Sequence, residues 1–188
     1  MNCELPTITF AFKEWSLVCE ALGSGHQSIL LRKGGITEGK MGFGFEHEQF
    51  LLFPTWFHGQ IEKTCWDGAS AVANEAPDSL TLEYVAVIEW SGFVTDREKL
   101  THLKELHILH ESVLDERFSY DAGDGKKGVH VAFVRVYRME PPATLPMEKR
   151  FGGCRSWIKL PEITLNPLVS VLSDEEHENR RRVLHKAL

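Results

Sequence analysis

Residues 82–90 have the sequence LEYVAVIEW, and this stretch does most to set the fold class. Branched and aromatic side chains fill it, and such side chains favour the pleated, half-buried surface of a β-strand. A second stretch of the same kind, VHVAFVRVYR, covers residues 129–138, and the prolines at 141 and 142 are expected to end it. Two long strands of this composition predict a β-sheet at the centre of the protein.

Three shorter apolar runs predict further strands. They are SILLR at residues 28–32, FLLF at 50–53, stopped by Pro54, and SWIKL at 156–160, which we expect to be the final strand. Residues 55–79 are ambiguous, and a helix followed by a polar loop is one interpretation.

Helical periodicity is found between these strands. Five apolar residues near the start recur at spacings of three and four and predict a helix that ends at Gly23: Phe12, Trp15, Val18, Cys19 and Leu22. Asp96 can cap a second helix, and a shorter one covers residues 111–118. Strands separated by single helices, without regular βαβ spacing, favour an α+β fold with a mixed, mostly antiparallel curved sheet or small barrel and packed helices.

The composition limits the class of protein. The 188 residues are expected to form one α+β domain over residues 1–172, followed by a charged, helical tail over 173–188. No stretch approaches the roughly 20 apolar residues that span a bilayer, and residues 1–10 lack a signal peptide. The four cysteines are scattered, which predicts reduced thiols in a cytoplasmic protein with no disulfide, no bound metal and no cofactor.

The charge is uneven along the chain. The net charge is −6, which argues against a protein that coats nucleic acid through bulk charge. Residues 126–159, however, contain eight basic and two acidic residues, so this segment is +6 and the remainder is −12. The segment is either a solvated basic edge or a face for a polyanion.

Polar side chains surround the ends of two predicted strands. Arg32 and Lys33 end the strand over 28–32, and Glu46-His47-Glu48 precede the next strand. His58 follows that strand, so we expect Arg32 or Lys33 to lie within about 10 Å, the width of a small-ligand cleft, of both Glu46 and His58. Arginine offers a planar fork for phosphate or a base edge, and histidine can act as acid or base. The alternative is that Glu46 and Glu48 pair with the two cations structurally.

Three other patterns resemble sites without completing one. Residues 38–40 have the acidic-x-Lys form of a restriction-nuclease arm, but no upstream Asp precedes them. His102, His107 and His110 have no accompanying Cys-x-x-Cys or His-Glu-x-x-His phrase that would indicate zinc. Cys154 lies beside an arginine but no identifiable base, which favours a structural thiol.

Several phrases together resemble an uncharacterised bacterial family known as domain of unknown function 1802. They run in order over residues 10–160: Lys13-Glu14-Trp15, Leu31-Arg32-Lys33-Gly34-Gly35-Ile36, Phe50-Leu51-Leu52-Phe53-Pro54-Thr55 with His58, Arg135-Val136-Tyr137 and Gly152-Gly153-Cys154-Arg155-Ser156-Trp157. The family has no assigned activity. Some members are fused to restriction-type nuclease domains, so the resemblance implies an accessory role in DNA restriction and a nuclease partner.

A fainter resemblance concerns residues 25–32, GHQSILLR. The phrase is similar to the Gly-x-Lys-x-x-Glu-x-Arg signature of the PUA-like ASCH domains, small β-barrels that bind RNA or modified bases. Gly25 and Arg32 match, whereas Gln27 replaces the lysine and Leu30 the glutamate. The resemblance implies a PUA-like fold, and the two departures argue against ASCH-type hydrolase chemistry.

The leading hypothesis is a binding module for nucleic acid, or for a modified or flipped base, in a restriction or defence setting. In it Arg32 and Lys33 contact phosphate, while Gln27, Glu46 and His58 line a base pocket.

Two other hypotheses remain open, so whether the protein is an enzyme is not decided by the sequence. One is a metal-independent hydrolase of a nucleotide-like substrate, with Glu46 or His47 as general base and His58 as a further candidate. The other is a non-catalytic interaction subunit.

Overall fold

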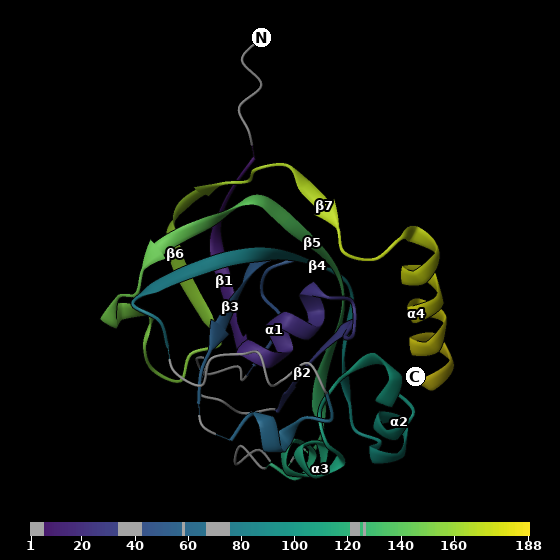
Figure 1. Ribbon diagram of the computed structural model, residues 1–188. Helices are drawn as coiled ribbons and strands as arrows, with labels where there is room; N and C mark the ends of the chain where they lie inside the picture. The colour runs from purple at the N-terminus through teal and green to yellow at the C-terminus, as the bar shows by residue number, and fades with distance from the viewer. Residues whose placement is uncertain (1–5, 34–42, 58, 67–75, 121–124, 126) are drawn as a thin grey trace.

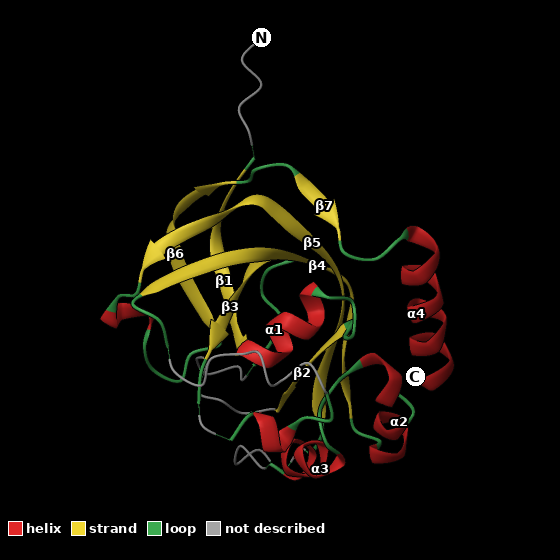
Figure 2. Cartoon of the chain, in the orientation of Figure 1, coloured by secondary structure: helices red, strands yellow, loops and turns green. Residues whose placement is uncertain are grey.

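The computed structural model describes residues 6–33, 43–57, 59–66, 76–120, 125 and 127–188. It has an α+β fold built on a mixed seven-stranded sheet, with helices packed around it (Figures 1 and 2). The strands are β1 (Thr7–Trp15), β2 (Ile29–Lys33), β3 (Gln49–Thr55), β4 (Ser79–Val94), β5 (Val129–Pro146), β6 (Trp157–Thr164) and β7 (Leu168–Ser170). The helices are α1 (Ser16–Gly23), α2 (Arg97–Thr101), α3 (Glu111–Ser119) and α4 (Asp174–Ala187).

The sheet is curved and open. Its strand order is β2-β5-β4-β3-β1-β6, and β7 pairs with β5. Only the β1–β3 pair among the described strands is parallel, and every other pair is antiparallel. The long antiparallel β4–β5 pair, whose strands are connected through α2 and α3, carries two register shifts, which increase its twist and bend it (Figure 2). The predicted α+β class with a mixed, mostly antiparallel curved sheet is therefore confirmed, and the sheet is not a closed barrel.

Two boundaries differ from the sequence prediction. Phe12 and Trp15 belong to β1, and α1 begins at Ser16, so the predicted first helix was wrong over its first half. The apolar spacing of three and four arose because an alternating strand runs directly into a helix.

Strand β5 also runs on past the two prolines to Pro146. Residues 139–142 lie opposite Glu83 alone, between the register pairs Leu82–Ala143 and Tyr84–Arg138. Proline is tolerated in such a bulge because no ladder hydrogen bond is needed there. The strand over 156–160 is β6, and β7 follows it, so it is not the final strand.

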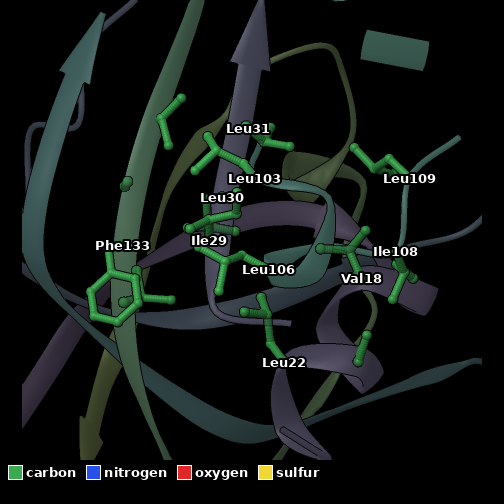
Figure 3. Packing of buried hydrophobic residues seen from close by; sticks show 14 of the residues in the cluster. Val18, Leu22, Ile29, Leu30, Leu31, Leu103, Leu106, Ile108, Leu109 and Phe133 are labelled. Carbon is green, nitrogen blue, oxygen red and sulfur yellow. The ribbon is translucent and has the colours of Figure 1, made fainter. Parts of the chain in front are cut away.

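Buried side chains form two clusters on the two faces of the sheet. The larger one contains Phe12, Phe50 and the apolar face of α1. Figure 3 shows part of it, where Val18 and Leu22 of α1 lie near the β2 side chains and Leu106. The smaller cluster contains Ala11, Leu51, Val85 and Ile158 and others from β1, β3, β4 and β6.

Helix α4 packs on the outside of the sheet. Ser173 caps it in a reciprocal capping box with Glu176. Leu184 and Ala187 are buried in the larger cluster, and the buried His177 ring lies 2.8 Å from a Glu89 carboxylate oxygen. Arg135 of β5 forms an ion pair with Asp174 at the start of the helix.

The described cysteines, Cys19, Cys65 and Cys154, are free, and Cys3 lies outside the described residues. Within those ranges, no helix is long and apolar enough to cross a membrane. The same residues contain no group of three or more His, Cys, Asp or Glu side chains placed to hold a metal ion.

Candidate functional site

Arg32 joins two strands that are not neighbours in the sheet. Its guanidinium donates a hydrogen bond to the carbonyl oxygen of Lys13, and its Nε lies 3.9 Å from Oε2 of Glu14. The same group lies 4.8 Å from the ring centroid of Phe12. Glu14 is 1% exposed, and its other carboxylate oxygen accepts a hydrogen bond from the Trp15 N–H. Because β2 is an edge strand and β1 lies near the opposite edge, this ion pair links the two sides of the open sheet.

A second guanidinium group, from Arg117 of α3, lies close to Trp15 and the end of β2. Arg117 is buried, donates to the carbonyl oxygen of Leu31, and lies 4.9 Å from the Trp15 ring centroid. Burial lowers the pKa of Arg117 to about 10, while Glu14 acts to raise it and Arg32 to lower it further. Arg32 is thus paired with the buried carboxylate of Glu14, and the charge of Arg117 lies close enough to interact with both, so we call Glu14, Arg32 and Arg117 the buried charge cluster.

Lys33 points away from this cluster, because successive residues of a strand face opposite sides. Its ammonium lies 4.0 Å from the ring centroid of Tyr120, which is 36% exposed. Arg32 and Lys33 therefore do not act on one face, although both are half-buried at the end of β2.

The other predicted residues are dispersed. The buried Gln27 amide is used structurally, since its Nε2 donates to the Ile29 carbonyl and its Oε1 accepts from the Ile108 N–H. Glu46 and Glu48 are exposed, and in the described part of the chain no ion pair joins either to Arg32 or Lys33. His58 lies outside the described residues, so its distance from Arg32 and Lys33 stays a prediction.

His47 belongs to a set of aromatic rings that sequence reasoning missed. Its imidazole stacks on Phe10, with the ring centroids 3.7 Å apart and the planes at 19°. The indole of Trp157 meets His47 edge-on, with the centroids 4.9 Å apart, and its Nε1 donates to the Gly44 carbonyl. His47 is therefore held in a fixed orientation at the surface between β1 and β6.

The rings continue across the sheet. Each consecutive pair has centroids 3.7 to 5.6 Å apart, and we call the set the ring array: Phe10, His47, Trp157, Phe12, Phe45, Phe43, His130 and Phe93. Phe12 and Phe43 are buried, whereas the other six members are partly or fully exposed. The array thus offers aromatic surface to solvent at several points from β6 to the end of β4.

Positive charge lies next to the ring array. Arg32 covers Phe12, and it is the cross-strand partner of His130, so both lie on the same face. Lys159 of β6 is exposed and is the cross-strand partner of Phe10. Burial lowers the pKa of His130, which keeps that imidazole neutral at pH 7. The array therefore has a cation near its middle and another at one end.

Several described cations of the basic segment over 126–159 already have partners. Arg135 is paired with Asp174, and Arg138 lies over Tyr84. Arg150 pairs with Glu148, while Arg155 and Lys159 are exposed near β6. The charges of Arg135 and Arg150 are thus offset locally, and the choice between a solvated edge and a polyanion face stays a prediction.

A family model described as "Domain of unknown function (DUF1802)" matches residues 11–183. The chain belongs to this family. The resemblance predicted from the five phrases is therefore confirmed, and the DUF1802 match includes Lys13-Glu14-Trp15 at the buried charge cluster as well as His47 and Trp157. No curated protein matches the chain.

Solved structures similar to this DUF1802 chain include ASCH proteins from Zymomonas mobilis. The crystal structure of ASCH from that organism has a TM-score of 0.47 and 12% identity, and the alignment covers 93% of this chain and 94% of the other. Two mutant proteins of the same ASCH each have a TM-score of 0.43 and 12% identity. One of them covers 74% of this chain and 88% of its own, and the other 92% and 96%. Likenesses this distant do not transfer an activity or a ligand to the DUF1802 chain.

Proposed function

We propose that the protein binds nucleic acid through unpaired bases, which stack on the exposed members of the ring array. The main support for this proposal is the ring array, in which His47 and Trp157 are held in fixed orientations at the surface beside Lys159. Base–aromatic stacking contributes about 1–3 kcal/mol per base and tolerates any sequence, because every base has a π-face. The faces of bases inside a duplex are covered by the neighbouring base pairs, so single strands or flipped bases are the expected ligands.

Charges next to the array supply the rest of the recognition. Lys159 and Arg32 provide positive potential for phosphates, which adds to the stacking without selecting a sequence. With a net charge of −6, the protein has little attraction for nucleic acid away from this face, so binding should be local and of moderate strength.

Fluorescence anisotropy with labelled oligonucleotides of about 12 nucleotides tests the proposal, with single-stranded RNA, single-stranded DNA and the matching duplex as probes. We expect His47→Ala to weaken single-strand binding by about 5- to 100-fold, which corresponds to the loss of one stacked base. We expect Lys159→Ala to reduce the slope of log affinity against log salt by about one. Arg32 is avoided, because its substitution would also break the contacts with Glu14 and Lys13.

His102→Ala and Lys104→Ala are matched controls, because both residues are exposed and lie outside the ring array. Each should leave the affinity unchanged. The proposal is wrong if none of the three probes binds saturably at about 50 mM salt, or if His47→Ala and His102→Ala behave alike. Tighter binding of the duplex than of the single strands would contradict binding through stacked, unpaired bases.

A hydrolase of a nucleotide-like substrate, with Glu46 or His47 as base, is the alternative to pursue if the probes are cleaved rather than retained. A link to DNA restriction, with a nuclease partner, also remains a prediction from the family resemblance. Co-purification of the protein with a nuclease encoded beside it would test that link.

A further inference from the structure

A pocket of about 360 Å³ lies beside α1, on the part of the sheet formed by β3 and β4. Its volume is within the range of small-ligand sites. The apolar part of its lining comes from Leu52 and Pro54 of β3 and from Trp56, which follows that strand. The polar part comes from α1 and β4 and includes Glu20, Glu83 and Tyr84. No residue of the ring array lines it, so the pocket is distinct from the proposed nucleic-acid face.

The pocket is acidic. Of the described residues that line it, the charged ones are Glu20 and Glu83. Partial burial raises the pKa of Glu20, and the neighbouring Glu83 raises it further, while Arg138, which lies in the adjoining hollow, acts in the opposite direction. Two carboxylates that repel each other at the wall of a pocket make a positively charged occupant favourable.

The aromatic part of the pocket is rigid. Tyr84 is buried and its ring lies so close to Gly23 of α1 that a Cβ there would be 2.1 Å from the ring. Burial, together with Glu20 and Glu83, raises the pKa of Tyr84 to about 12, so its hydroxyl stays protonated. The wall formed by Tyr84 is therefore fixed before any ligand arrives.

We propose that this pocket binds a small organic cation, an ammonium or guanidinium group carried on an apolar stem. The carboxylates of Glu20 and Glu83 take the positive charge, and Trp56 and Pro54 pack against the stem. The indole face adds attraction for a cation, because its quadrupole is negative above the ring. Phosphate-bearing ligands are repelled by the same two carboxylates.

Isothermal titration calorimetry of the full-length protein with agmatine and spermidine, at low salt, tests this inference. We expect saturable binding of one molecule per chain, and a loss of at least tenfold in affinity for the double variant E20Q/E83Q. Glu162→Gln is the control, because it removes an exposed charge on β6, away from the pocket. Adenosine monophosphate should not bind at the pocket.

A second variant tests the pocket independently, in case the double variant E20Q/E83Q fails to fold. Thr81 lines the pocket and is exposed, so Thr81→Lys would place an ammonium inside it and should block agmatine without loss of thermal stability. Equal weakening by Glu162→Gln and E20Q/E83Q would mean attraction by net charge alone and would overturn the proposal. Binding that is unsaturable, or insensitive to Thr81→Lys, would overturn it as well.

Discussion

Replacing Gly23 with alanine would place a Cβ atom 2.1 Å from Cζ of Tyr84 and 2.4 Å from its Cε1 and Cε2. Ordinary contacts of a Cβ atom are 3.4–4 Å, so the overlap with the ring exceeds 1 Å. Tyr84 is 7% exposed and packs in the larger hydrophobic cluster, so the ring can yield only toward the pocket that it lines, and this movement would break its packing. Either α1 moves off the sheet or the ring leaves its site.

Each of these two outcomes lowers the free energy of unfolding by an amount that can be approximated. Overpacking of a core costs about 1–3 kcal/mol, and loss of a buried aromatic ring costs about 3–5 kcal/mol. Alanine recovers about 1 kcal/mol through its higher helix propensity, because Gly23 lies in the last turn of α1. We therefore expect Gly23→Ala to lower the free energy of unfolding by about 3 kcal/mol and Tm by about 10 °C in a chain of this length.

Urea unfolding followed by circular dichroism measures this effect. Gly44→Ala is the matched control, since in the described part of the chain nothing lies within 4 Å of its added Cβ. In a Tyr84→Ala background, Gly23→Ala should cost nothing, because the overlapping ring is gone. A stability of Gly23→Ala within about 0.5 kcal/mol of wild type would refute the packing described for α1 and β4.

Two further predictions concern buried ionisable groups. Burial lowers the pKa of His107 to about 4, below its unfolded value near 6.5, so stability should fall by about 2–3 kcal/mol between pH 7 and pH 4.5 as the unfolded state takes up a proton. His107→Asn should remove that part of the pH dependence in urea unfolding, and equal slopes for the two proteins would contradict the burial of a neutral imidazole. Glu14→Gln should cost about 3 kcal/mol in the same assay, because Arg32 loses its paired carboxylate and the buried Arg117 loses a stabilising negative charge, whereas the exposed Glu48→Gln should cost less than about 0.5 kcal/mol.

The strands could be predicted where their local amino-acid composition is sufficient to indicate a strand. The runs over 28–32, 50–53, 82–90 and 129–138 are confirmed as β2, β3, β4 and β5, because branched and aromatic residues fill each one. The β1–α1 boundary could not be placed, since a two-residue alternation that runs into a helix imitates helical spacing. The bulge that accommodates Pro141 depends on the partner strand, which local sequence does not reveal.

The candidate site was less accessible to sequence reasoning. Arg32 was identified, but its partner Glu14 lies on a strand that is not its neighbour in the sheet, so only the sheet order brings the two together. One signal for the ring array was present, because Phe43, Phe45 and His47 alternate along the chain as side chains on one face of an extended segment do. The glycines that surround this segment predict a flexible loop, in which no common face is expected.

The pairing of β1 with β6 has a consequence for how the protein folds. Strand β1 over residues 7–15 hydrogen-bonds to residues 157–164, so nearly the whole chain must be synthesised before this part of the ladder can form. Closing so long a loop is entropically costly, and folds dominated by distant contacts form slowly. During translation, β3 can pair with one edge of β1 early, but the other edge of β1 stays unpaired until residue 164 has been made, and an unpaired strand edge is a site at which other chains can aggregate.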